Sequence, residues 1–311
     1  MPVSRISRRL VAAAVLITAA VASLTACGSS SSTPTDQAAV PTADVVSAIH
    51  ADPRIHDLLP ADIRTAGSAT LGTVQAVGQA GLPHAGVVDG RQVGLDIDIA
   101  DAVARVLGIE WKRDYGTFAT IIPGVQNGRY QVGEANFGVT EARTRVLDFA
   151  TYLNDGQGFL GASTVTAEHI ASLTDACGYR IATSPGSTFQ TLLETHADDC
   201  AKAGKKPWTV QYFADQGPIV LGLQNGKVDL YFGPTLSLRY AEKHIAGTRF
   251  LGELTTTPVG FVTAKGSPLA PALVAAVNKL ITTGEYGAIF AKWGVPASQV
   301  HESQINPSAT F

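Results

Sequence analysis

Strand-like and helix-like segments alternate along most of this 311-residue chain, and this order restricts the folds open to it. Residues 94–108 begin with alternating apolar positions and continue as an amphipathic helix that Gly108 would end. Strand-forming runs at 109–115, 130–139 and 180–184 are separated by helical patterns. Because consecutive parallel strands need a crossover that is usually a helix, the chain is predicted to be α/β with mostly parallel sheets.

The same patterns predict further elements towards the C-terminus. The predicted helices lie at 118–128, 187–204 and 217–226, the strands at 208–213 and 228–233, and two amphipathic helices within 268–294 part at Gly284.

The first 26 residues are typical of an export signal. Three arginines precede Leu10–Leu24, an apolar run of 15 residues that is too short for a comfortable membrane span. Cys27 follows in "LTAC", which resembles the lipobox of bacterial lipoproteins, where the cysteine is lipidated and becomes the mature N-terminus. An ordinary secretory signal with a chance cysteine is the alternative. The polar run 28–37 is typical of a flexible tether.

Composition argues against nucleic acid as a partner. Removal of the signal takes the formal net charge from −3 to −6, because that segment holds three arginines and no acids. No basic stripe with interleaved aromatic residues is present. Apart from the signal, no apolar run approaches 18 residues, so no other segment is predicted to span a membrane.

The remaining cysteines, Cys177 and Cys200, would both reach an oxidising compartment after export. They form either one disulfide or two buried free thiols, and export favours the disulfide. Such a bridge would contribute about 3 kcal/mol in the chain-entropy model.

Motifs of known enzyme classes are missing from the sequence. There is no G-x-S-x-G elbow, no H-E-x-x-H and no P-loop, and the seven histidines lack metal-ligand spacing. Residues 156–161 match G-x-G-x-x-G, but a strand-like segment follows where a dinucleotide site needs a helix. We therefore expect neither a metal nor a cofactor, and no catalytic residue.

Two segments could bind an anion. Ser187 and Thr188 stand where a strand ends and a helix begins, and free N–H groups at a helix N-terminus attract anions. Arg143 stands near the start of another helix that follows a strand. A plain N-cap and a solvated charge are the alternatives, but the occurrence of both features in one exported chain favours a ligand site.

From about Leu59 onwards the chain resembles the family 3 extracellular solute-binding proteins, the receptors of polar amino acid ABC importers. The resemblance rests on segments in the same order and spacing, including "VGLDIDIADAVARVLG", "FATIIPGVQNGRYQVG", "TEARTRVLDFATY" and "LGLQNGKVDLYFG". It implies a two-lobed periplasmic-binding-protein type II fold, with two mixed, mostly parallel sheets joined by two crossover strands. The implied division is signal 1–26, tether and N-terminal segment 27–58, lobe 1 59–154 and 259–311, lobe 2 159–256, and hinge crossovers 155–158 and 257–258.

The resemblance also implies roles for individual residues. In the family, the arginine of T-x-x-R grips the ligand's α-carboxylate, and Arg143 matches it. Ser187 and Thr188 match a second carboxylate contact from the other lobe, and Phe118 matches an aromatic residue that packs on the ligand. Tyr152, near the first crossover, belongs either to the core or to the pocket. The ligand-binding residues implied are Arg143, Phe118, Gly138, Thr140, Asn136, Ser187, Thr188 and Pro234.

Three departures from the family pattern weaken the side of the site that binds the ligand's ammonium. Gly233-Pro234 stands where the family usually has Gly-Asp, and Gly138 replaces a serine or threonine. Residues 78–90, which often hold aromatic residues, contain none except His84. These departures predict a small carboxylate ligand whose amine is absent, blocked or quaternised.

Glu134 is an unusual residue for the interior of a predicted strand. It shares a strand face with Asn136, because residues i and i+2 point the same way. It is either a substitute partner for a ligand cation or a structural carboxylate.

The function implied is solute capture without chemistry. The protein would be a monomer, anchored by acylated (palmitate-bearing) Cys27 to the outer face of the cytoplasmic membrane, and would deliver a small carboxylate-bearing ligand to an ABC permease. Ligand would close the lobes because only the closed form contacts it from both sides. The alternatives are a solute sensor that signals to a membrane kinase, and a dehydratase or lyase. The enzyme would need an acid or base such as Glu134 in the cleft, and a Glu134 pKa raised by burial would favour it.

Overall fold

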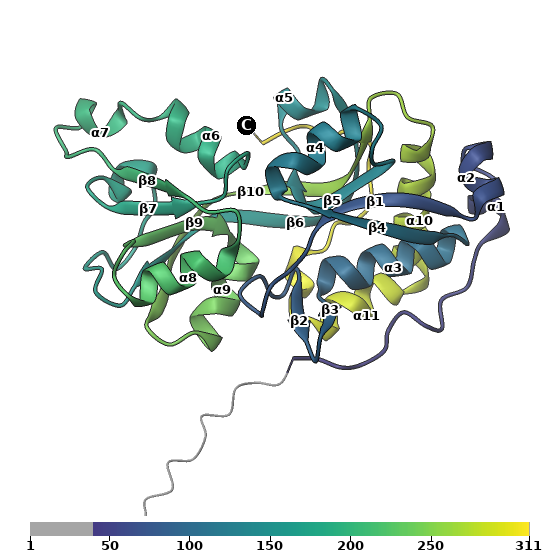
Figure 1. Cartoon of the computed structure of the whole chain (residues 1–311), viewed down its shortest axis with the longest axis horizontal. Helices are drawn as coiled ribbons and strands as arrows, with labels where there is room; N and C mark the ends of the chain where they lie inside the picture. Colours follow the sequence, from purple (N-terminus) through teal and green to yellow (C-terminus); the bar gives the residue numbers. More distant parts are fainter. Residues whose placement is uncertain (1–39, 311) are drawn as a thin grey trace, which may run out of the picture. The chain divides into compact units, whose positions relative to one another are not determined.

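The computed structural model describes residues 40–310 of the chain (Figure 1). The predicted signal and Cys27 lie outside the described residues. Within 40–310 there is no helix of the length and apolarity that a membrane crossing requires. The N-terminal part of this range carries little regular structure but packs well, since Ile49 is buried and Val45 and Val46 lie against the core.

One mixed sheet of eight strands organises the described chain, in the order β4-β1-β5-β10-β6-β9-β7-β8. A separate hairpin pairs β2 (Gly86–Val88) with β3 (Arg91–Val93). The sheet strands are β1 Ser68–Val74, β4 Glu110–Gly116, β5 Val132–Gly138, β6 Leu147–Ala162, β7 Arg180–Thr183, β8 Thr209–Tyr212, β9 Leu230–Pro234 and β10 Thr248–Ala264.

Strands β6 and β10 are the two crossovers. They pair antiparallel along their whole length, from Leu147 opposite Ala264 to Ala162 opposite Thr248 (Figure 1). On one side β1 pairs in parallel with β4 and β5, and on the other β7 pairs in parallel with β8 and β9. We call the part with β1, β4 and β5 the first lobe and the part with β7, β8 and β9 the second. The predicted two-lobed α/β fold is confirmed, and the two expected sheets merge into one through the crossovers.

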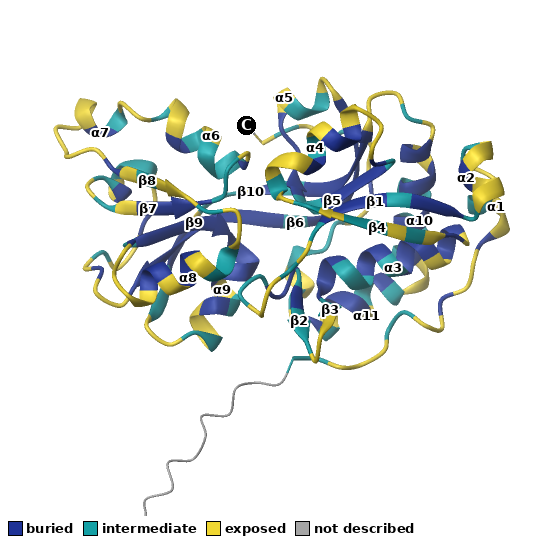
Figure 2. Cartoon of the chain, viewed as in Figure 1, coloured by how far each residue is buried: buried dark blue, intermediate teal, exposed yellow. Residues whose placement is uncertain are grey.

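Helices cover both faces of the first lobe's strands. Helices α3 (Leu95–Leu107), α10 (Leu269–Thr283) and α11 (Glu285–Lys292) lie on one face, and α4 (Phe118–Gln126) lies on the other (Figure 1). Helix α3 turns its apolar stripe inwards, and Gly108 ends it with φ +66, a left-handed conformation that favours glycine. Buried residues accordingly concentrate on the strands and on the helix faces that meet them (Figure 2).

The second lobe contains α6 (Thr188–Thr195), α7 (Asp199–Lys202), α8 (Gln216–Gln224) and α9 (Thr235–His244). Its core includes the stacked rings of Phe159 and Phe232, 4.3 Å apart. The prediction of a single helix over 187–204 is wrong. His196 ends α6, and its ring Nδ1 lies 2.7 Å from the Asp199 carboxylate at the start of α7. The short elements are α1 Pro53–His56, α2 Ala61–Ala66, α5 Glu141–Thr144, η1 Leu173–Ala176 and η2 Pro296–Ser298.

The G-x-G-x-x-G match at 156–161 lies inside strand β6, so it opens no helix. The residue boundaries predicted for the lobes and hinges stay a prediction.

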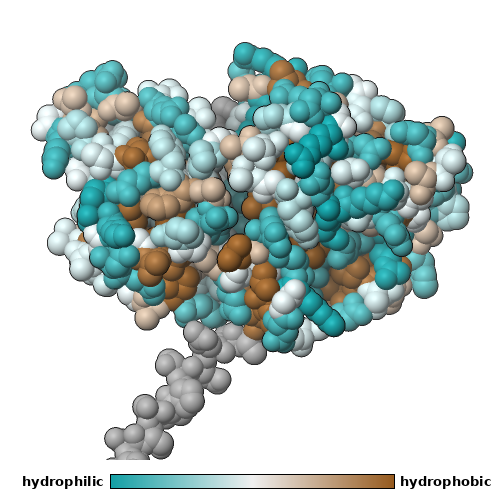
Figure 3. All heavy atoms as spheres, in the orientation of Figure 1, coloured by the Kyte–Doolittle hydropathy of each residue, from teal (hydrophilic) through white to brown (hydrophobic). Residues whose placement is uncertain are grey.

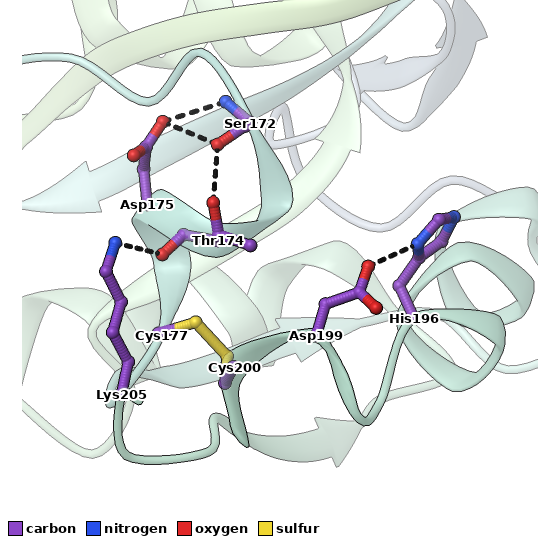
Figure 4. The surroundings of a disulfide bond; sticks show 8 residues. All are labelled: Ser172, Thr174, Asp175, Cys177, His196, Asp199, Cys200 and Lys205. Atoms are coloured by element: carbon purple, nitrogen blue, oxygen red, sulfur yellow. Dashed lines mark hydrogen bonds and ion pairs between the residues drawn. A yellow bond between two sulfur atoms is a disulfide. The ribbon is translucent and has the colours of Figure 1, made fainter. Parts of the chain in front are cut away.

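Cys177 and Cys200 form a disulfide that ties the end of η1 to α7 (Figure 4). We expect the double variant Cys177→Ser/Cys200→Ser to lower the free energy of unfolding by about 3 kcal/mol, because the open chain gains conformational entropy when unfolded. Urea unfolding of the variant and of the oxidised wild type measures this difference. Equal unfolding midpoints and slopes would show that the bridge does not stabilise the second lobe.

Candidate functional site

A cavity of about 160 Å³ lies between the lobes. Cavities of this size hold a small organic molecule. Polar and apolar side chains border the furrow between the lobes on the face shown in Figure 3. The cavity is lined by most of the residues predicted from the sequence, namely Phe118, Glu134, Asn136, Gly138, Arg143, Ser187, Thr188 and Pro234. Thr140 is not among its lining residues and instead caps α5, where its hydroxyl accepts the Arg143 N–H at 3.2 Å.

The guanidinium of Arg143 is a cation at the cavity wall. Its Nη1 donates to the Gly138 carbonyl at 3.0 Å and its Nη2 to the Gly186 carbonyl of the second lobe at 3.2 Å. Phe137 and Phe118 flank the guanidinium, with ring centroids 5.7 and 6.0 Å away. Burial lowers the pKa of Arg143 to about 10, so the group remains charged at neutral pH. Within residues 40–310 it forms no ion pair with an acid, which leaves N–H groups for a ligand anion.

The second predicted anion contact lies at the start of α6. Ser187 is the N-cap: its hydroxyl accepts the Gln190 N–H at 3.2 Å and donates to the Ser184 carbonyl at 2.6 Å. The Thr188 hydroxyl lies 3.3 Å from the Gln157 amide nitrogen, which donates to it. Both residues line the cavity, and Ser187 also performs the ordinary capping role.

A buried imidazole between two carboxylates was not predicted from the sequence. Nδ1 of His84 lies 3.2 Å from Asp96, and Nε2 lies 2.9 Å from Asp155. Burial alone would lower the pKa of His84, but the charges of Asp96 and Asp155 and their hydrogen bonds raise it to about 10. The ring is therefore an imidazolium at neutral pH.

Asp155 connects the lobes through one carboxylate. Its Oδ2 accepts hydrogen bonds from His84 and, at 2.9 Å, from the Asn136 amide. Its Oδ1 accepts the backbone N–H groups of Gly156 at 2.7 Å and Leu236 at 3.1 Å. Residues of the first lobe and the start of α9 in the second lobe thus share one buried acid on crossover β6.

Glu134 lines the cavity and is only 3% exposed. Its carboxyl group accepts hydrogen bonds from Tyr152 at 3.1 Å and Thr73 at 3.2 Å, and the Asp96 carboxylate lines the same cavity. Burial, followed by the negative charge of Asp96, raises the pKa of Glu134 to about 8. The side chain is therefore mostly protonated at neutral pH.

The two replacements that suggested a missing ammonium site are both at the cavity. Pro234 ends β9 and offers neither a carboxylate nor an N–H. A Cβ at Gly138 would lie 2.9 Å from the Thr257 methyl, so a serine there would require Thr257 to shift. Four acids nevertheless line the cavity, namely Asp96, Glu134, Asp155 and Asp215. The eroded cation-binding side stays a prediction.

Several buried acceptors at the cavity find no hydrogen-bond donor within the described part of the chain. They are Asp96 Oδ1, Asn136 Oδ1, Gln157 Oε1 and Gln216 Oε1. A ligand with several N–H donors would satisfy them. No three His, Cys, Asp or Glu side chains of residues 40–310 are grouped so that they could hold a metal ion.

Comparison with known proteins agrees with this architecture. The model of the bacterial extracellular solute-binding proteins, family 3, matches residues 77–296. The arginine-binding protein ArgT of Corynebacterium glutamicum is 29% identical over 221 residues, which are 70% of this chain and 72% of that protein. The ABC transporter glutamine-binding protein GlnH of Bacillus subtilis is 27% identical over 213 residues, 66% of this chain and 73% of that protein.

Solved structures share the fold. The structure of an ancestral arginine-binding protein bound to arginine has a TM-score of 0.65 and 27% identity, and the match covers 73% of this chain and 98% of that one. The two lobes and paired crossovers are those of the type II periplasmic-binding-protein fold. The family's model matches more than half of this chain. The chain therefore belongs to the bacterial extracellular solute-binding proteins, family 3.

Proposed function

We propose that this protein captures an amino acid between its lobes and delivers it to an ABC permease. The observation that carries the proposal is the charge pattern of the cavity. Apart from Asp215, a lining acid that is exposed, Arg143 supplies one positive charge without an acidic partner in the described chain, and Asp96, Asp155 and the His84 imidazolium together leave one negative charge when Glu134 is protonated. A zwitterion, with one carboxylate and one ammonium, complements this pattern.

The ligand's α-carboxylate would lie on the Arg143 guanidinium, whose plane is fixed by the carbonyls of Gly138 and Gly186. Paired N–H donors match a carboxylate in geometry as well as in charge. Phe118 would pack on the ligand from the first lobe, and Ser187 and Thr188 would approach the carboxylate from the second.

The acids that line the cavity change the ligand that we expected from the sequence. Pro234 and Gly138 suggested a blocked or absent amine, but the cavity offers acids and unpartnered amide oxygens to a free ammonium. Relatives named for binding arginine and glutamine support an unmodified amino acid. We therefore favour a free amino acid over an N-modified one or an organic acid.

A thermal-shift screen of the mature domain tests this function. The panel contains the common amino acids, their N-acetyl forms, betaines and simple organic acids. A millimolar ligand with a micromolar Kd would stabilise the folded state by about 4 kcal/mol, which raises Tm by several degrees. Shifts from free amino acids support the proposal, whereas shifts confined to N-acetyl forms, betaines or organic acids contradict it.

Membrane attachment through Cys27 is part of the same proposal. The exported protein would be a monomer held on the outer face of the cytoplasmic membrane, which is where a permease could receive the ligand. We expect Cys27→Ala to move the protein from the membrane fraction to the medium or the soluble fraction, because the acyl chains would be missing. Fractionation with Cys177→Ser as the control measures this, and retention of Cys27→Ala in the membrane would contradict the anchor.

An enzymatic role is the second candidate, and one observation favours it. Glu134 is a protonated carboxyl group at the cavity wall, with a pKa raised to about 8 by burial, as a general acid would require. Mass spectrometry of the ligand recovered after long incubation separates the candidates. Unchanged ligand supports the binding protein. Conversion that Glu134→Gln abolishes would support a dehydratase or lyase.

A further inference from the structure

We infer that the Glu134–Asp96 carboxyl pair selects ligands by charge: the pair keeps its proton beside a zwitterionic amino acid and must release it to admit an amino acid with a cationic side chain. The inference rests on the proposed function. It assigns to the pair a role in specificity in addition to its place in the wall.

Glu134 and Asp96 are two acids in one buried region, and His84 is the cation nearest to Asp96. Glu134 and Asp96 are each 3% exposed and line the same cavity, and Asp96 Oδ1 finds no donor among residues 40–310. Burial and the negative charge of Asp96 both favour the protonated form of Glu134, so the proton stays on Glu134 while no further cation is near.

Within residues 40–310, the groups packed around the pair supply no second cation. Tyr152 on β6 and Thr73 on β1 are neutral donors that bond the two oxygens of Glu134. His84 is the cation next to Asp96, and Asp155 on the crossover shares it. Among the described residues the remaining lining cation is Arg143, which the ligand carboxylate would neutralise. The proton therefore balances the second acid.

An independent observation ties the pair to the ligand. Gln157 is 2% exposed and lines the same cavity, and its Oε1 has no donor among residues 40–310. Asn136 Oδ1, also without a donor there, lines the cavity from the strand that carries Glu134. These neutral acceptors can take an α-ammonium, which leaves the acid pair for a second cation.

The consequence is a difference in proton count. A zwitterion enters with the proton in place. A ligand with a guanidinium or a second ammonium lowers the pKa of Glu134 by its own charge, and the proton passes from Glu134 to the buffer. Arginine and citrulline form the matched pair of probes, because they have the same length and differ in the charge of the side-chain end.

Isothermal titration calorimetry of the mature domain in two buffers of different ionisation enthalpy counts these protons. At about pH 7 we expect arginine to release nearly one proton and citrulline none, and the affinity for arginine relative to citrulline to rise towards about pH 9. Glu134→Gln should abolish the release and weaken arginine at least about tenfold, with citrulline unchanged. Glu110→Gln, at an exposed acid that does not line the cavity, is the control and should keep the release.

Each other outcome overturns the inference. Four outcomes would do so and leave the proposed function intact. They are arginine binding without proton release, equal release by both probes, release that persists in Glu134→Gln, and citrulline binding with no arginine binding even at about pH 9. If neither arginine nor citrulline binds while another amino acid does, the inference is also overturned and the proposed function stays intact. Failure of every amino acid overturns the proposed function and the inference with it.

Discussion

Arg143→Ala is expected to abolish ligand binding while the protein stays folded. The guanidinium is held by backbone carbonyls of both lobes, and its proposed partner is the ligand's carboxylate. Removal of one member of a buried charge pair costs about 2–5 kcal/mol, which weakens binding about 30- to 5,000-fold. Calorimetric titration of wild type and variant with an amino acid found in the thermal-shift screen measures the loss.

Arg145→Ala is the matched control for this prediction. Arg145 lies two residues away, is exposed and pairs with Glu141 on the helix surface. Its loss should leave affinity unchanged, because exposed ion pairs contribute little. Equal affinities for wild type and Arg143→Ala would show that Arg143 does not bind the ligand and only connects the carbonyls of Gly138 and Gly186.

Asp155→Ala is expected to be strongly destabilising. The carboxylate accepts hydrogen bonds from His84, Asn136 and the backbone N–H groups of Gly156 and Leu236. Its removal leaves a buried imidazolium with one acidic partner, and breaking a buried pair typically costs about 3–5 kcal/mol. Denaturant unfolding at neutral pH measures the change.

The pH dependence of this loss identifies its cause. The folded-state pKa of His84 lies at about 10, above its ordinary value of 6.5. Stability from the charged pair is therefore fully present below about pH 6.5 and is lost as the pH rises towards about 10. The difference between wild type and Asp155→Ala should shrink over that window. A difference independent of pH would assign the loss of stability to the backbone contacts. The control is Asp114→Ala, which breaks an exposed pair with Arg129 and should lower the free energy of unfolding by less than about 1 kcal/mol.

Local patterns predicted most of the fold. The apolar stripe of α3 and its end at Gly108, and the division of the last two helices at Gly284, follow from helical spacing and from glycine's access to positive φ. The interruption of the helix after Thr195 was not visible, because it depends on the contact of His196 with Asp199 and on a disulfide to a distant segment.

Some of the residues that line the cavity were predictable from the sequence, and the buried cluster of His84, Asp96 and Asp155 was not. Arg143 and Ser187 lie in short motifs that can be recognised from a few neighbouring residues, and the structure places both at the cavity. His84, Asp96 and Asp155 come from a loop, the start of a helix and a crossover, and only the tertiary fold brings them together. The available signal was Asp155, an acid within a long apolar and glycine-rich strand, where burial demands a partner.

A crystal structure of the mature domain with the amino acid that binds most tightly in the screen tests the central claim most directly. We expect the ligand in the cavity between the lobes, with its α-carboxylate bound to the Arg143 guanidinium by two hydrogen bonds of about 2.7–2.9 Å. Its ammonium should face the side of the cavity that carries Asn136 and Gln157. A ligand whose carboxylate contacts other groups, or density outside this cavity, would contradict the account.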